Sequence, residues 1–109
     1  MKSETKFGRE LVSKVRQQGG FVQRIETAIG AGVPDMYVCY NGMSIWIETK
    51  VGDYTLQPLQ QSWHKQLRVA GGKVVTVTKV KEDMYRVEDG KLSRAVTNLT
   101  DLVKLILTF

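Results

Sequence analysis

The fold is decided by residues 34–50, which read PDMYVCYNGMSIWIETK. Two runs rich in apolar, β-branched and aromatic side chains flank the dipeptide Asn41-Gly42. This dipeptide is the strongest short-range signal for a two-residue hairpin turn, and runs of this kind are typical of strands. The stretch therefore predicts two antiparallel neighbouring strands, over residues 35–40 and 43–51.

Upstream of the hairpin, the sequence predicts one helix and one strand. Phe7, Leu11 and Val15 recur at the spacing of one helical face, which predicts a helix over residues 4–18. Two glycines end that pattern, as is common at the end of a helix. The alternating residues 21–25 then predict a strand.

Downstream of the hairpin, residues 57–70 predict a second helix, and residues 73–78 predict a buried strand. The helix provides the crossover that allows the strand after it to run parallel to an earlier one. We expect His64 to be exposed. The helix also carries an apolar stripe that we expect to face the core, formed by Leu59, Trp63, Leu67 and Ala70.

The C-terminal part predicts a weaker strand over residues 84–87 and a short helix over residues 98–108. The apolar residues of this last helix cover more than one of its faces, and such a surface needs cover. We therefore expect the helix to pack at an interface between two copies of the chain.

The predicted order is α-β-β-β-α-β with a short C-terminal strand and helix addition. This order indicates an α/β protein with a mixed sheet flanked by helices. A chain of 109 residues has room for one domain. We expect that domain to span residues 1–109, with a core over about residues 4–80 and the addition over residues 81–109.

Composition excludes several classes of protein. Hydrophobic residues make up 42% and charged residues 25% of the chain, which is typical of a soluble globular domain. No apolar run approaches the ~20 residues of a membrane helix. One cysteine and one histidine argue against zinc fingers and Cys/His catalytic pairs. Without a secretory signal, we expect an intracellular, cytoplasmic protein and no membrane partner.

The charge of the chain favours an anionic partner. Sixteen Lys and Arg residues against eleven Asp and Glu residues give a net charge of +5. A small basic domain binds a polyanion, most often nucleic acid, although a basic surface can also be merely soluble.

Two carboxylates meet at one end of the predicted hairpin. Asp35 stands near the start of the first strand and Glu48 near the end of the second, so the turn brings them to the same end of the sheet. Converging carboxylates bind hard divalent cations such as Mg²⁺ or Mn²⁺. Lys50 shares a face with Glu48 and could orient water or stabilise a phosphate, and the backbone carbonyl of Thr49 could add a ligand.

Each of these features also has an ordinary structural explanation. Glu48 and Lys50 could form an exposed ion pair, which is worth at most about 1 kcal/mol. The dipeptide Pro34-Asp35 could simply open a turn. The combination of all of them around one hairpin, in a basic chain, favours a functional site.

Three segments of the sequence together resemble a known family. They are Gly32-Val33-Pro34-Asp35, Ile47-Glu48-Thr49-Lys50 and the run LQPLQQSW at residues 56–63. They are similar to the VRR-NUC domain, the virus-type replication-repair nuclease of the PD-(D/E)XK superfamily, over roughly residues 4–80. The resemblance implies a restriction-endonuclease-like αβββαβ core. Stand-alone members of this size are typical of phage genomes.

The resemblance also implies roles for particular residues. Asp35 and Glu48 would bind the metal, Lys50 would orient water or stabilise charge, and Gln60 would face the same site. The family also uses an acidic residue on the first helix. Glu4 lies in helical register with the apolar face and is our choice, while Glu10 stays open as the alternative.

Arg24 is a further candidate, for binding DNA. The family often has a basic residue on this strand, where a guanidinium could contact the scissile phosphate. An exposed arginine with no functional role is an equal alternative.

The implied function is a Mg²⁺- or Mn²⁺-dependent DNA endonuclease, selective for branched DNA such as Holliday junctions, in phage replication, recombination or repair. Relatives of this kind act as homodimers, and cutting both strands symmetrically requires two active sites. We expect no small-molecule cofactor. The alternatives are a non-catalytic DNA-binding module on the same fold and a sequence-specific restriction-type endonuclease.

Overall fold

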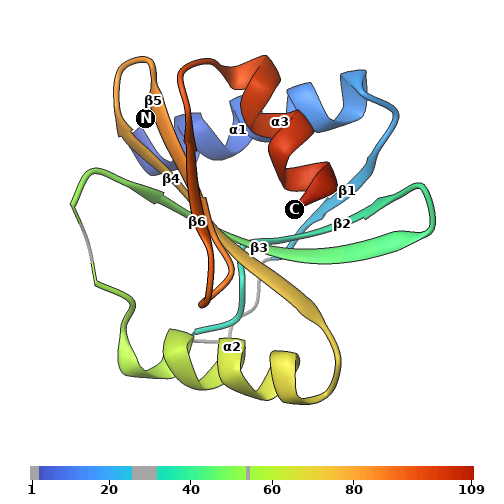
Figure 1. Ribbon diagram of the computed structural model, residues 1–109, viewed down its shortest axis with the longest axis vertical. Coiled ribbons are helices and arrows are strands. Elements are labelled where there is room, and N and C mark those ends of the chain that lie inside the picture. Colours follow the sequence, from blue (N-terminus) through green and yellow to red (C-terminus); the bar gives the residue numbers. More distant parts are fainter. Residues whose placement is uncertain (1–2, 26–31, 54) are drawn as a thin grey trace.

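The computed structural model describes residues 3–25, 32–53 and 55–109, which form three helices and one six-stranded sheet (Figure 1). None of the described helices has the length and apolar character needed to span a membrane. The elements in chain order are α1 (Ser3–Gln17), β1 (Phe21–Arg24), β2 (Met36–Tyr40), β3 (Met43–Val51), α2 (Pro58–Val69), β4 (Lys73–Lys81), β5 (Met84–Glu88), β6 (Ser93–Val96) and α3 (Leu99–Thr108).

The sheet is mixed, as the sequence predicts, and its strands lie in the order β1-β2-β3-β4-β5-β6. Strands β2 and β3 pair antiparallel across Asn41 and Gly42, whose φ angles of 49° and 79° are those of a tight turn with positive φ at both central residues. Strands β3 and β4 run parallel, and α2 crosses between them. The hairpin and the crossover helix are therefore both confirmed.

Helices α1 and α3 cover one face of the sheet and enclose the hydrophobic core (Figure 1). The buried core residues alternate along each strand, as period-two side chains require. They come from α1 (Phe7, Leu11, Val12, Val15), from the strands (Val22, Met36, Val38, Ile45, Ile47, Val75, Val77, Tyr85, Val87) and from α3 (Leu102, Val103, Ile106, Leu107).

The apolar surface of α3 is covered by its own chain. Leu102, Val103 and Ile106 are fully buried against α1 and the sheet. The sequence analysis expected the apolar residues of this helix to be buried by a second copy of the chain. That expectation was wrong, because α1 and β5 of the same chain bury them.

Helix α2 lies on the opposite face of the sheet, and its predicted orientation was wrong (Figure 1). Leu59 and Trp63 are 57% and 38% exposed, whereas His64 is buried. The side of α2 that faces the sheet carries Gln60, His64 and Arg68, spaced four residues apart. Arg68 holds this orientation by donating from Nη2 to the carbonyl of Val74 at 3.0 Å.

The strands at the β4–β6 edge differ from the prediction. Strand β4 extends to Lys81, with an irregularity between Lys79 and Lys81. Strand β6 was not predicted, because its four residues are mostly exposed and carry no alternating apolar pattern.

Candidate metal centre

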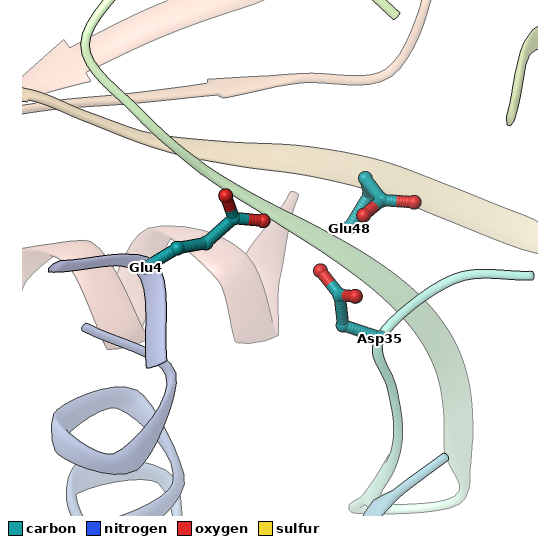
Figure 2. Close-up of side chains that lie close together, drawn as sticks. All are labelled: Glu4, Asp35 and Glu48. Carbon is teal, nitrogen blue, oxygen red and sulfur yellow. The ribbon is translucent and has the colours of Figure 1, made fainter. Parts of the chain in front are cut away.

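Three carboxylates from separate elements converge at one place (Figure 2). Glu4 lies in the first turn of α1, Asp35 directly precedes β2, and Glu48 lies in β3. Each offers an oxygen atom, and these oxygens all lie within 4.8 Å of one another. The hairpin thus places Asp35 beside Glu48, and α1 adds a third acid.

Thr49 fixes the orientation of Asp35. Its backbone N–H and its hydroxyl both donate to Oδ2 of Asp35, at 2.7 Å and 2.8 Å. The backbone of Asp35 is also held, because its carbonyl accepts from the N–H of Ile25 at 2.9 Å. The sequence suggested only a carbonyl ligand for Thr49, and that suggestion stays a prediction. Its role in holding Asp35 was missed, although a threonine beside Glu48 is the available signal.

Glu48 is buried in a strongly acidic environment. It is 1% exposed. Burial raises the pKa of Glu48 to about 9, and the hydrogen bond and negative charge of Asp35 add to this effect. The Lys50 ammonium opposes the rise, and the charge of Glu4 reinforces it. Without a cation, the cluster therefore retains a proton at neutral pH.

His64 lies directly behind Glu48, contrary to the prediction that it is exposed. Its Nε2 is 3.7 Å from Oε1 of Glu48, which is too long for a hydrogen bond. Burial lowers the pKa of His64 to about 4, and the nearby charges of Arg68 and Lys50 lower it as well. The imidazole is therefore neutral at pH 7. The spacing of Gln60, His64 and Arg68 along one helical face is the signal that could have revealed it.

The donor set fits a hard divalent cation. Oε1 of Glu48 is buried and has no hydrogen-bond partner within the described part of the chain. A buried carboxylate that is not fully hydrogen-bonded is costly, and a cation held by this carboxylate would offset that cost. Carboxylate oxygens from Glu4, Asp35 and Glu48 are the ligands that Mg²⁺ and Mn²⁺ prefer.

The other candidate residues lie at different places around this cluster. Arg24 lines a pocket of about 190 Å³ together with Glu4, Thr5, Asp35 and Thr49. Lys50 is half-buried, follows the alternation of β3 onto the face of Glu48, and acts on its charge. Gln60 uses Oε1 to accept from the N–H of Gln57 at 2.9 Å, so it caps α2.

Glu10 lies away from the cluster. It lines a separate pocket with Lys79 and Glu82, next to β4. Of the two acidic residues considered on the first helix, the structure brings Glu4 to Asp35 and Glu48 and leaves Glu10 apart.

The architecture matches two solved structures of known fold. A structure described as a VRR_NUC domain superposes with a TM-score of 0.63 and 22% identity, covering 72% of this chain and 85% of that one. The chain has a VRR-NUC-like fold. A second structure, Hjc, a Holliday junction resolvase from the archaeal hyperthermophile Archaeoglobus fulgidus, shares the VRR-NUC-like fold over 93% of this chain and 92% of its own, with 16% identity and a TM-score of 0.60.

No protein-family model and no curated protein matches the sequence. The fold assignment of this VRR-NUC-like chain therefore rests on its structure.

Proposed function

We propose that this protein is a Mg²⁺- or Mn²⁺-dependent endonuclease that hydrolyses DNA phosphodiester bonds. One observation carries the proposal: Glu4, Asp35 and Glu48 each offer an oxygen within 4.8 Å of the others, beside a pocket that Arg24 lines together with Glu4 and Asp35. Anionic ligands for a cation and a guanidinium for a phosphate, side by side, suit phosphodiester hydrolysis.

The three carboxylates would hold the metal. When bound, the metal would lower the pKa of a coordinated water molecule and stabilise the charge that develops on the phosphate. Thr49 keeps Asp35 oriented through two hydrogen bonds, so the ligand is in place before the metal arrives.

Two cationic side chains have roles of their own. Lys50, on the face of Glu48, orients the attacking water or stabilises the phosphate charge. Arg24, which lines the pocket with Glu4 and Asp35, contacts the scissile phosphate. Gln60, in the first turn of α2 and one turn before His64, faces the same site in this proposal.

The proposed substrate is branched DNA, in phage replication, recombination or repair. The similarity of fold to a Holliday junction resolvase supports this choice. The net charge of +5 supports a polyanionic partner. A homodimer would supply the two active sites needed to cut both strands symmetrically.

The test is cleavage of labelled DNA. A four-way junction, a flap and a linear duplex are each incubated with Mg²⁺, Mn²⁺ or EDTA. Lys50→Ala is the variant expected to be inactive. Lys65→Ala, which removes an exposed lysine of α2, is the matched control for loss of one positive charge. We expect metal-dependent cutting of the junction by wild type and by Lys65→Ala only.

The other outcomes separate the alternatives. Cutting of flaps or duplex alone keeps the nuclease and rejects the preference for junctions. Binding without any cutting favours a non-catalytic module. Cutting at one short sequence in every substrate favours a restriction-type enzyme.

A further inference from the structure

A basic groove adjoins the candidate metal centre. A groove of about 590 Å³ runs beside α1 and β1 and is lined by Arg9, Val12, Ser13, Arg16, Gln17 and Arg24. We propose that this groove binds the sugar-phosphate backbone of the nucleic-acid strand that enters the metal centre. The inference rests on the proposed function and extends it to a specific path for the substrate.

The lining of the groove has the chemistry of a phosphate site. Three of its residues carry guanidinium groups, and no carboxylate is among the lining residues that the structure describes. Ser13 and Gln17 add neutral hydrogen-bond donors. Arginine binds phosphate bidentately, and most contacts of proteins to nucleic-acid backbones come from these residue types.

The spacing of these residues suits a backbone. Arg9, Ser13 and Arg16 lie on one face of α1, because positions three and four apart are neighbours on a helix. Arg9 and Arg16 are seven positions apart, or about 10 Å along the axis. One strand of duplex DNA presents a phosphate about every 3.4 Å along its axis, so the pair would span roughly three phosphates.

The groove is partly preorganised. Nη2 of Arg16 donates to the carbonyl of Val22 at 3.4 Å, which ties α1 to β1. The guanidinium of Arg24 lies close to Gly8, where an added Cβ atom would meet Nη2 at 3.4 Å. Guanidinium groups that are held in place lose less conformational freedom when a phosphate binds.

Arg24 connects the groove to the metal centre. It lines the groove and also the pocket that contains Glu4 and Asp35. A strand lying along α1 would therefore reach the carboxylates by way of Arg24. This continuity distinguishes the groove from an isolated basic patch.

The pocket beside α1 that Glu10 lines does not have this character. It contains Glu10 and Glu82 as well as lysines, and Lys79 pairs with Glu82 at 2.9 Å. The acidic residues of this pocket neutralise the charge of its lysines, so a polyanion would be attracted to it less strongly. The contrast between the two sides of α1 favours the arginine groove as the path.

The test measures binding without cleavage. The double variant Arg9→Gln, Arg16→Gln is compared with Arg94→Gln, Lys104→Gln, which removes the same charge from exposed positions on β6 and α3. Both are made in a Glu48→Gln background. Binding of labelled junction and duplex DNA is measured across a NaCl series in EDTA.

We expect the groove variant to bind more weakly and the slope of log affinity against log salt to decrease in magnitude by about 1.8, or ~0.9 for each lost phosphate contact. The control should keep the slope of its parent. A slope in the groove variant equal to that of the control would overturn the proposal. Binding of polyglutamate by the Glu48→Gln parent as tightly as it binds DNA would also overturn it. Arg9→Gln alone, at an exposed position, gives a second reading if the double variant is unstable.

The two proposals can fail separately. If wild type does not cut DNA but the groove variant loses salt-dependent binding, the groove stands and the nuclease does not. If wild type cuts DNA and the groove variant binds like the control, the nuclease stands and the groove does not.

Discussion

The imidazole of His64 and the carboxylate of Glu48 face each other across the contact between α2 and β3, with Nε2 and Oε1 3.7 Å apart. Both side chains are buried. His64 is the residue of α2 that is buried most completely among those the structure describes. The second helix therefore contacts the carboxylate of Glu48 through the side chain of His64.

Replacing His64 should weaken metal binding. His64→Ala would leave space behind Glu48 and allow its carboxylate to move, and groups that support metal ligands typically contribute about 10- to 100-fold in affinity. We expect a loss in that range for Mn²⁺, measured by isothermal titration calorimetry. Trp63→Ala, at the exposed neighbouring position, is the matched control. Unchanged Mn²⁺ affinity in His64→Ala would contradict a supporting role.

The free energy of unfolding without metal should fall as the pH rises from 6.5 to 9. The pKa of Glu48 is about 9 when folded and 4.5 as a free side chain, so the folded chain binds more protons in this interval. His64 has the opposite effect, but its pKa changes from 6.5 to about 4, so it acts below pH 6.5. Urea unfolding in EDTA should show the decrease in wild type.

Glu48→Gln is the control for this pH dependence. The variant lacks the titrating group and should lose much less stability between pH 6.5 and 9. Parallel curves for wild type and variant would show that Glu48 does not retain its proton. In wild type, Mg²⁺ should stabilise the fold more at pH 9 than at pH 6.5, because it replaces the proton at the cluster.

Removing the hydroxyl of Thr49 should loosen Asp35. Thr49→Val keeps the shape of the side chain but removes the donor that lies 2.8 Å from Oδ2. A hydrogen bond to a charged group contributes about 1.5–3 kcal/mol. We expect cleavage to fall about 10- to 100-fold, measured as single-turnover rates at saturating Mg²⁺. Thr49→Ser retains the hydroxyl and should restore most of the activity, and a rate in Thr49→Val equal to wild type would count against this role.

The two acids of α1 give a direct comparison. Glu4→Gln should reduce cleavage by more than about 100-fold, since even groups behind metal ligands contribute up to that amount. Glu10→Gln removes the same charge from the same helix but at a pocket beside Lys79 and Glu82. Its activity should stay close to wild type. Equal losses in the two variants would show that the helix contributes charge alone.

The hairpin and its two acids could be predicted because the period of a strand is unambiguous. Asn41-Gly42 defines the turn, and a two-residue turn fixes which residues of β2 and β3 face each other. The proximity of Asp35 and Glu48 follows from that register. The sequence left two candidates, Glu4 and Glu10, for the acidic residue of the first helix. Helical register alone does not give the distance from either residue to a neighbouring element.

The orientation of α2 could not be predicted, because a helical pattern shows which residues share a face but not which face is inside. The apolar stripe of Leu59 and Trp63 is more exposed than His64. The sheet face beneath α2 carries Glu48 and Thr76, and a polar helix face meets it. Periodicity predicts burial reliably where the opposing surface is apolar, as it is for α1.

The arginine groove was also missed, for a different reason. Its residues come from α1 and β1, and their proximity depends on how the helix packs across the strand. Arg24 was recognised singly, and its connection to Arg9 and Arg16 appears only in three dimensions.

The hairpin has a consequence for the order in which the protein folds. Asp35 and Thr49 are only 14 positions apart and are joined across a tight turn, so the entropy lost in bringing them together is small. Hairpins form in about 1–10 μs, whereas the parallel pairing of β3 with β4 must wait for α2 to close a longer loop. We therefore expect the hairpin half of the centre to assemble first, and Glu48 to lose contact with water only when α2 docks. The nascent chain would then hold two of its three acids together before it can enclose them.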